Sequence, residues 1–210
     1  EEIAIAYGGG RWSDNKGTVN GGKNSTGGSG GHVIPAEILN SHLEGKFEIF
    51  ISTDLRGYKY LTTKTNETII IDTPRMNLNF LIIFRLIKFF YLTIKSYLFL
   101  KKNKIDKVIS TGGYMSLPIC LSAKILGLNI YLLEPNFVLG RANKFFLKFC
   151  NKIFCYKKDL KNFPEKFKDK IKIIPPLVRK KFYEKKLLNS ENKKFCILVV
   201  GGSQGAKLFE

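Results

Sequence analysis

A cluster of glycines near the N-terminus is the part of the sequence best suited to bind phosphate. Residues 26–32 read TGGSGGH, and an apolar, helix-like stretch follows them. Glycines let backbone N–H groups close around phosphate oxygens, and a helix that starts directly afterwards adds the positive end of its dipole. We therefore predict a phosphate-binding turn. Its predicted ligands are Thr26, Gly27, Gly28, Ser29, Gly30 and Gly31.

His32 stands at the lip of this turn and is one of two histidines in the chain. An imidazole titrates near neutral pH, so it can accept a proton from a substrate hydroxyl. A histidine that caps the helix or donates to phosphate is the alternative, and the sequence leaves both open. His42 has no partner nearby in the sequence and is interpreted as a surface residue.

The same pattern of strand, glycines and helix occurs twice more. Thr111 to Gly113 follow the apolar run 107–110, and Gly201 to Gly205 follow the run 195–200. Open α/β sheets bind their ligands at the carboxyl ends of parallel strands. Three such junctions predict a nucleotide-type α/β fold in which the turns contact a phosphorylated ligand.

Strand-like and helix-like segments alternate along the chain, which favours a parallel sheet with crossover helices. The predicted strands are 47–52, 68–72, 107–110, 130–133, 152–156, 170–174 and 195–200. The predicted helices are 35–43, 77–102, 116–126 and 140–150. Pro175 and Pro176 stop any regular element, so we place a linker at residues 176–194.

The N-terminal 25 residues fit this pattern poorly. Residues 2–7 can form a strand, but a segment rich in Gly, Asn and Ser separates them from the phosphate turn, where a tight connection is expected. Residues 1–25 are therefore predicted to be an aberrant segment that displaces the strand before the turn. Residues 17–23 match GxxxxGK, but Asn24 replaces the Ser or Thr that a nucleoside triphosphate loop requires.

Residues 78–100 are long and apolar enough to suggest contact with a membrane. Three internal cations cost about 8–10 kcal/mol at the bilayer centre against about 5–9 kcal/mol gained by the apolar residues, so spanning is disfavoured. The cations form a narrow stripe bordered by aromatic residues, which is typical of a helix lying on an anionic membrane surface. An ordinary core helix is the alternative. The predicted membrane contacts are Phe84, Arg85, Lys88, Phe89 and Lys95.

The formal net charge of +18 favours an anionic partner: a phosphorylated substrate, phospholipid headgroups or nucleic acid. The four cysteines have no CxxC spacing and no histidine at ligand spacing, so neither a zinc site nor a disulfide framework is predicted. We expect buried, reduced thiols.

Five ordered motifs resemble the MurG-type N-acetylglucosaminyltransferases of peptidoglycan synthesis. They are the first glycine turn at 26–36, TGGYMSLP at 111–118, EPNFVLGRANK at 134–144, PPLVR at 175–179 and GGSQGA at 201–206. The resemblance implies a GT-B fold, in which two Rossmann-like domains face a cleft. Residues 26–175 would be the acceptor-binding, membrane-associating domain, and residues 195–210 the start of a truncated UDP-sugar-binding domain.

The resemblance also implies a reaction. The 4-hydroxyl of undecaprenyl-pyrophosphoryl-MurNAc-pentapeptide, lipid I, attacks C1 of UDP-N-acetylglucosamine with inversion, and lipid II forms as UDP leaves. No cofactor or catalytic metal ion is expected. The enzyme would lie peripherally on the cytoplasmic face of the bacterial inner membrane, with the lipid-linked acceptor, an anionic membrane surface and other cell-wall synthesis proteins as partners. Nucleic acid is not an expected partner.

Site residues follow from the resemblance position by position. His32 matches the residue proposed as base or acceptor ligand, and Glu134 is the second predicted catalytic residue. The predicted acceptor-diphosphate ligands are those of the first turn with Gly112, Gly113 and Tyr114. The predicted UDP-N-acetylglucosamine ligands are Ser29, Gly30, Gly31, Asn136, Arg179, Ser203, Gln204 and Gly205. Leu133 and Pro135 depart from the His and Gln common in the family.

Two alternative functions stay open. One is another GT-B enzyme, such as a lipid glycosyltransferase acting on diacylglycerol or a UDP-sugar epimerase. The other is a non-catalytic, basic module that binds a membrane or nucleic acid. Because most of a donor domain is missing after Glu210, we expect the fragment to bind acceptor or membrane without turnover.

Overall fold

The structure is a computed structural model that describes residues 2–6, 30–59, 68–73, 82–180 and 182. The chain divides into two compact units, residues 1–180 and 181–210, and the described elements belong to the first. The predicted strand 195–200 and the third glycine turn lie outside the described residues.

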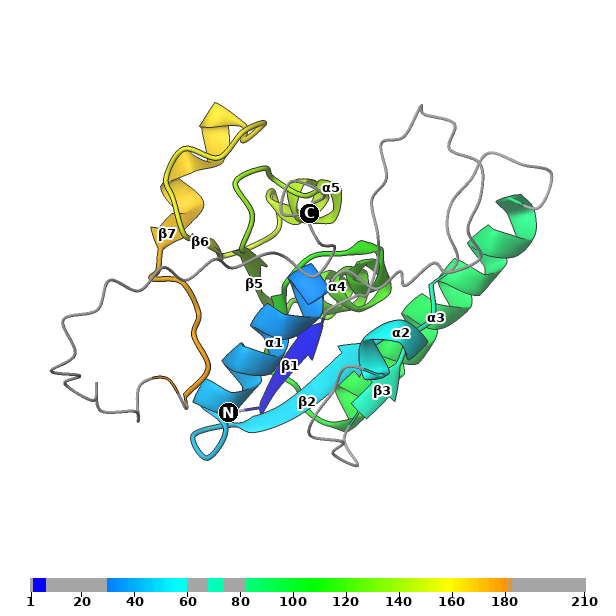
Figure 1. Cartoon of the computed structure of the whole chain (residues 1–210). Helices are drawn as coiled ribbons and strands as arrows, with labels where there is room; N and C mark the ends of the chain where they lie inside the picture. The colour runs from blue at the N-terminus through cyan, green and yellow to red at the C-terminus, as the bar shows by residue number, and fades with distance from the viewer. Residues whose placement is uncertain (1, 7–29, 60–67, 74–81, 181, 183–210) are drawn as a thin grey trace, which may run out of the picture. The chain divides into compact units, whose positions relative to one another are not determined.

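Seven parallel strands form one sheet in the order β3-β2-β1-β4-β5-β6-β7 (Figure 1). The strands are β1 Glu2–Ala6, β2 Glu48–Thr53, β3 Thr68–Ile70, β4 Lys107–Ser110, β5 Asn129–Glu134, β6 Lys152–Cys155 and β7 Ile171–Ile173. The helices are α1 Gly30–Leu43, α2 Leu55–Tyr58, α3 Ile82–Lys102, α4 Leu117–Ile125 and α5 Arg141–Phe146, with 3₁₀ turns at Tyr114–Ser116 and Glu165–Lys170. The predicted α/β class is confirmed.

The first strand corrects the interpretation of the N-terminus. β1 lies in the middle of the sheet, paired on one side with β2 and on the other with β4. Ile3 and Ile5 pack in the core beneath α1, whereas Ala4 and Ala6 belong to the core on the opposite face. The strand that precedes the glycine turn is therefore present at residues 2–6, and the sheet begins well before residue 26. Residues 7–29 are the connection between β1 and α1.

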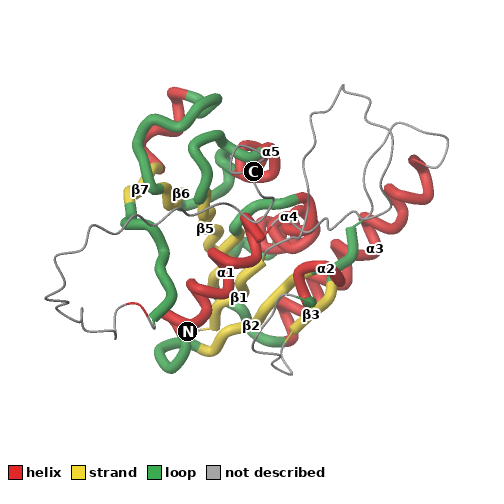
Figure 2. The backbone as a smooth tube through the Cα atoms, in the orientation of Figure 1, coloured by secondary structure: helices red, strands yellow, loops and turns green. Residues whose placement is uncertain are grey.

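Helices cover both faces of the sheet, as Figure 2 shows for α1 beside β1. Val33 and Ala36 of α1 pack on Ile3, Ile5 and Ile51. The larger core on the other face contains Leu92 and Leu100 of α3 with residues of α4. Small side chains let α3 and α4 approach closely, and the Ser122 hydroxyl of α4 donates to the Thr93 carbonyl of α3 at 2.7 Å.

Candidate functional site

The first turn of α1 meets the end of β4 at the carboxyl edge of the sheet. α1 begins at Gly30 and not at the predicted residue 35, so Gly30, Gly31 and His32 form its first turn and Pro35 lies inside the helix. The first N–H groups of a helix have no partner within it, and they carry the positive end of the dipole. Two of the predicted phosphate ligands therefore offer backbone donors beside His32. Thr26, Gly27, Gly28 and Ser29 lie outside the described residues.

Two hydrogen bonds hold His32 against the second glycine turn. Its Nδ1–H donates to the carbonyl of Thr111 at 2.7 Å, and the Thr111 hydroxyl donates to the His32 carbonyl at 3.0 Å. The Thr111 N–H in turn donates to the Ala6 carbonyl at the end of β1. A carbonyl partner places the ring proton on Nδ1, so Nε2 carries the free lone pair of the neutral ring. That lone pair can accept a proton.

The second glycine turn needs glycine at two successive positions. Gly112 and Gly113 have φ angles of +86° and +83°, which residues other than glycine rarely adopt. The Gly112 N–H donates to the Ser110 hydroxyl, and the Ser116 hydroxyl donates to the Gly113 carbonyl. The turn thus has a defined shape, and it places Tyr114, a predicted acceptor ligand, at the start of the following 3₁₀ turn.

Glu134 ends β5 and is fully buried. One carboxylate oxygen accepts from the Asn136 amide at 3.0 Å and from the Asn136 backbone N–H at 3.3 Å. The other accepts from the Gly140 N–H at 2.8 Å and from Nδ2 of Asn143 at 3.0 Å. Four N–H groups therefore compensate the buried charge, and the exposed Asn136 is positioned by this carboxylate. The sequence showed the motif at 134–144, but it gave no sign that N–H groups within the motif donate to the Glu134 carboxylate.

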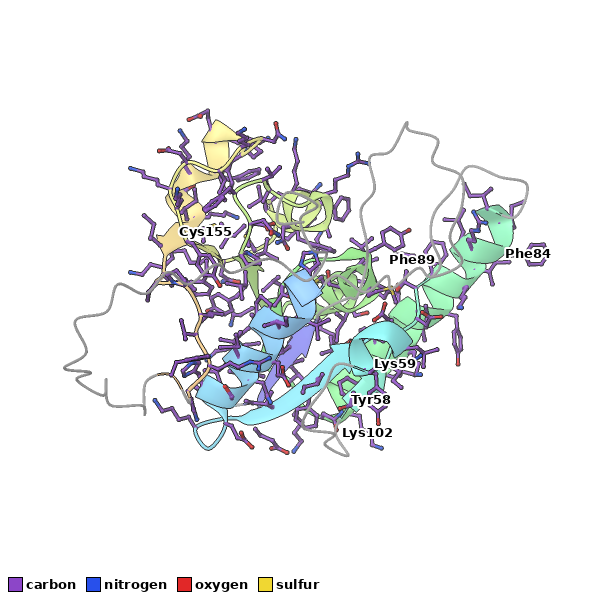
Figure 3. All side chains as sticks on the ribbon, in the orientation of Figure 1. Tyr58, Lys59, Phe84, Phe89, Lys102 and Cys155 are labelled. Carbon is purple, nitrogen blue, oxygen red and sulfur yellow. The ribbon has the colours of Figure 1, made fainter. Side chains whose placement is uncertain are left out.

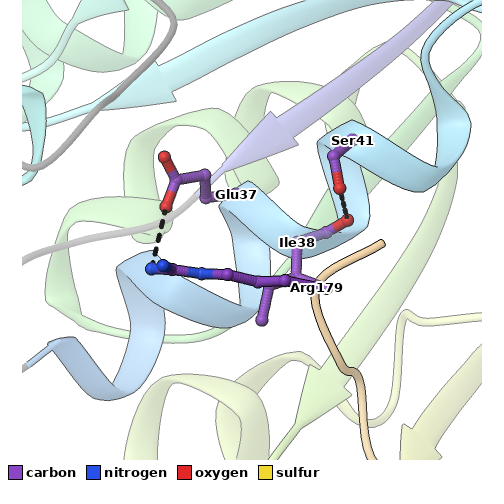
Figure 4. A network of polar contacts seen from close by, with 4 residues as sticks. All are labelled: Glu37, Ile38, Ser41 and Arg179. Atoms are coloured by element: carbon purple, nitrogen blue, oxygen red, sulfur yellow. Dashed lines mark hydrogen bonds and ion pairs between the residues drawn. The ribbon is translucent and has the colours of Figure 1, made fainter. Parts of the chain in front are cut away.

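Arg179, a predicted donor ligand, lies beside the middle of α1. Its guanidinium is 3.9 Å from the Glu37 carboxylate (Figure 4). Glu37 lies about two helical turns after Gly30, where α1 begins. Nε2 of His42 is 2.8 Å from the Val178 carbonyl, so the residue interpreted as a lone surface histidine joins α1 to the segment after β7. Ser203, Gln204 and Gly205, the other predicted donor ligands, lie outside the described residues.

The outer face of α3 carries an apolar stripe that is exposed among the described residues. Ile87, Phe90 and Ile94 expose 60%, 61% and 59% of their surface, while Leu92 and Ser96 face the core. Of the predicted membrane contacts, Phe84, Lys88 and Lys95 are exposed, whereas Arg85 and Phe89 are half-buried. Figure 3 shows Phe84 projecting from the start of the helix. Among the described residues, no helix meets the length and hydropathy needed to cross a membrane.

The described cysteines are buried, as expected. Burial raises the pKa of Cys120 to about 12, although hydrogen bonds from Ser110 and Ser116 lower it in part. Burial, and secondarily the Glu134 carboxylate, raises the pKa of Cys155 to about 12. In the described ranges, no three His, Cys, Asp or Glu side chains are grouped so that they could hold a metal ion.

We expect these thiols to resist alkylation in the folded protein. Because the thiolate is the nucleophile and both pKa values lie near 12, Cys120 and Cys155 stay protonated at pH 8. A Cys196→Ser variant treated with iodoacetamide should remain unmodified when native and react fully in urea, as read by mass spectrometry. Labelling of either thiol in the native protein at pH 8 would contradict the burial.

The same pKa values predict how stability depends on pH. The unfolded thiols ionise near 9.0 and the folded ones near 12, so the free energy of unfolding should fall as pH rises above 9.

Comparison with known proteins assigns the family. Residues 24–155 match the model of the glycosyltransferase family 28 N-terminal domain. The chain is 52% identical over 187 residues to the UDP-N-acetylglucosamine--N-acetylmuramyl-(pentapeptide) pyrophosphoryl-undecaprenol N-acetylglucosamine transferase of Pelagibacter ubique (strain HTCC1062), covering 89% of this chain and 52% of that protein. It is 35% identical to the Rickettsia canadensis enzyme of the same name, covering 87% of this chain and 52% of that enzyme. The chain thus spans about half the length of these curated relatives.

Solved structures support the same fold. Acinetobacter baumannii MurG matches with a TM-score of 0.69 and 21% identity, over all of this chain and 55% of that one. The UDP-GlcNAc 2-epimerase of Neisseria meningitidis matches with a TM-score of 0.51 and 13% identity, over 82% of this chain and 45% of that one. The MurG resemblance and the Rossmann-like half of a GT-B fold are confirmed. This chain belongs to glycosyltransferase family 28, whose N-terminal domain it contains.

Proposed function

We propose that this chain is the acceptor-binding half of an inverting transferase. The full-length protein would move N-acetylglucosamine from UDP-N-acetylglucosamine to the 4-hydroxyl of undecaprenyl-pyrophosphoryl-MurNAc-pentapeptide. The observation that carries this proposal is the 52% identity to the Pelagibacter ubique enzyme that bears this activity in its name. The position of His32 supports it independently: the residue lies in the first turn of α1 and is hydrogen-bonded to the second glycine turn.

Two requirements of the proposed reaction, a base and a site for the acceptor diphosphate, are assigned to described residues. Nε2 of His32 takes the proton of the acceptor hydroxyl as the new O4–C1 bond forms and the C1–phosphate bond breaks. The N–H groups at the start of α1 bind the acceptor diphosphate, helped by the helix dipole. UDP departs with the bonding electrons, and the anomeric centre inverts. Resident cofactors and catalytic metal ions are not part of this proposal.

The test is a transfer assay with the full-length protein, UDP-N-acetylglucosamine and a lipid-linked MurNAc-pentapeptide acceptor. We expect a disaccharide product that forms only when both substrates are present. Conversion of UDP-N-acetylglucosamine to its 2-epimer without acceptor would favour the epimerase alternative, whose members share the fold. A protein that produced neither, although correctly folded, would refute the transferase proposal.

Arg179 offers a smaller test of donor binding in the full-length protein. A charge-assisted hydrogen bond to a diphosphate contributes about 1.5–3 kcal/mol, so Arg179→Ala should raise the KM for UDP-N-acetylglucosamine about 10-fold or more. The contact with Glu37 is long at 3.9 Å, and the Arg179 side chain is 48% exposed, so this ion pair is worth about 1 kcal/mol or less. Glu37→Gln is therefore the matched control and should leave KM within about twofold. Equal effects of the two substitutions would mean that Arg179 only anchors its own segment to α1.

The proposed location is the cytoplasmic surface of the inner membrane. The apolar stripe on α3 lies opposite the face that packs on the core, so it is free to enter the headgroup region. Lys88 is exposed on the same helix, where it can meet anionic headgroups. The exposed Lys95 donates to the Ile70 carbonyl at 3.4 Å. Docking through α3 would bring the carboxyl edge of the sheet, where α1 begins, within reach of a lipid-linked acceptor.

A further inference from the structure

A buried amide connects Glu134 to the second glycine turn. Asn143, on α5, is 1% exposed, and its Nδ2 donates both to Glu134 at 3.0 Å and to the Leu133 carbonyl at 3.3 Å. These two acceptors define which end of the amide is nitrogen. Among the described residues, Oδ1 of Asn143 is buried without a hydrogen-bond partner. Glu134 therefore orients the Asn143 amide, and in this orientation the amide oxygen makes no hydrogen bond to a described residue.

The same amide lies against Gly112. A Cβ atom at Gly112 would come within 3.1 Å of Nδ2 and 3.4 Å of Oδ1 of Asn143. The amide thus occupies the space that a side chain at residue 112 would need. Gly112 directly follows Thr111, whose carbonyl accepts the ring proton of His32. A continuous series of contacts leads from the Glu134 carboxylate through Asn143 and the turn to the His32 imidazole.

We propose that Glu134 and Asn143 are a positioning pair for the second glycine turn. Glu134 orients the Asn143 amide, the amide supports the turn at Gly112, and the turn fixes the ring of His32. Glu134 transfers no proton in this arrangement, because both of its oxygens are engaged by N–H donors and it is closed off from solvent. This assignment replaces the catalytic role predicted for Glu134, and its kinetic part rests on the proposed transferase function.

The chemistry of the pair predicts an unusual response to substitution. In Glu134→Gln, one acceptor oxygen becomes an NH₂ group that faces N–H donors, so part of the network is lost. In Asn143→Asp, two carboxylates face each other in a buried site, which is strongly unfavourable. In the double variant, the amide introduced at position 134 can donate to the carboxylate introduced at position 143. The second substitution should therefore repair part of the damage done by the first.

The experiment compares the three variants in the full-length protein. We expect kcat/KM to fall about 10-fold in Glu134→Gln and about 100-fold in Asn143→Asp, and to recover at least about 5-fold in the double variant relative to Asn143→Asp. The pH profile of Glu134→Gln should keep the shape of the unsubstituted protein. A loss of about 10²–10⁴-fold in Glu134→Gln with a missing pH limb would identify a proton-transfer group and overturn the proposal. A double variant whose kcat/KM is lower than that of both single variants would also overturn the proposal.

Two further readouts do not depend on catalysis. The melting temperature should show the same rescue, and hydrogen exchange at residues 111–116 should speed up in Asn143→Asp and slow again in the double variant. Asn151→Asp is the matched control, because Asn151 is an exposed asparagine near the start of the neighbouring strand β6. If Asn143→Asp does not fold, Asn143→Ala replaces it, with faster exchange at 111–116 expected and unchanged exchange contradicting the proposal. Stability rescue without any transferase activity would refute only the proposed function.

Discussion

Replacement of His32 by asparagine is expected to lower the kcat of sugar transfer by the full-length protein about 10²–10⁴-fold. An asparagine amide can still donate to the Thr111 carbonyl from roughly the position of Nδ1, so the contact between α1 and the second glycine turn should persist. What the asparagine lacks is the lone pair on Nε2 that accepts a proton. The substitution therefore separates the two roles that the sequence left open for this histidine.

The matched comparison is His32→Ala, which removes both the hydrogen bond and the base. If proton transfer is the main contribution, the two variants should lose activity to within a few-fold of each other. If His32 only caps the helix or holds the turn, asparagine should retain most of the activity and alanine should not. Melting temperatures measured on the same samples distinguish a chemical loss from an unfolded site.

Removal of the apolar stripe on α3 is expected to weaken membrane binding about 100-fold. Burial of an isoleucine side chain contributes about 1.5–3 kcal/mol, so Ile87→Ala together with Ile94→Ala should cost about 3 kcal/mol of partition free energy. Both residues are exposed, so the substitution should leave the stability of the fold nearly unchanged. The measurement is flotation of the full-length protein with vesicles containing phosphatidylglycerol.

Ile173→Ala with Val178→Ala is the control, since both residues are exposed but lie on or after β7 and not on α3. This control should bind vesicles like the unsubstituted protein. Equal binding by the two double variants would show that α3 is not the docking surface. A DNA titration tests the nucleic-acid alternative, because phosphate-driven binding would weaken linearly in log salt concentration whereas apolar insertion would persist.

Local sequence patterns predicted much of the fold. Six of the seven predicted strands fall on or within a few residues of β2 to β7, because each is a short apolar run bounded by polar residues or glycines. The positive φ angles at Gly112 and Gly113 explain why a paired glycine marks the end of β4. The period also predicted the α3 helix, but it did not identify which of its apolar residues stay exposed. Ile87, Phe90 and Ile94 were not among the predicted membrane contacts. Arg85 and Phe89 were, and both are half-buried.

Contacts between distant segments were beyond the reach of such patterns. The hydrogen bond between His32 and Thr111 joins residues 79 apart, and that between His42 and Val178 joins residues 136 apart. Residues 2–7 were recognised as a possible strand, but not as the central strand that precedes the turn, because residues 7–29 separate the two in sequence. Strand pairing depends on neighbours in space and not on loop length.

Local residue patterns were enough to establish the α/β class and the family motifs. They also predicted phosphate binding at the glycine turns and His32 as the candidate base. Each of these depends on residue type and local spacing. Tertiary packing makes Glu134 a buried acceptor for four N–H groups and places the Asn143 amide in the space beside Gly112, neither of which local patterns reveal. A carboxylate in a motif is compatible with proton transfer or with positioning, and only the donors packed around it distinguish the two.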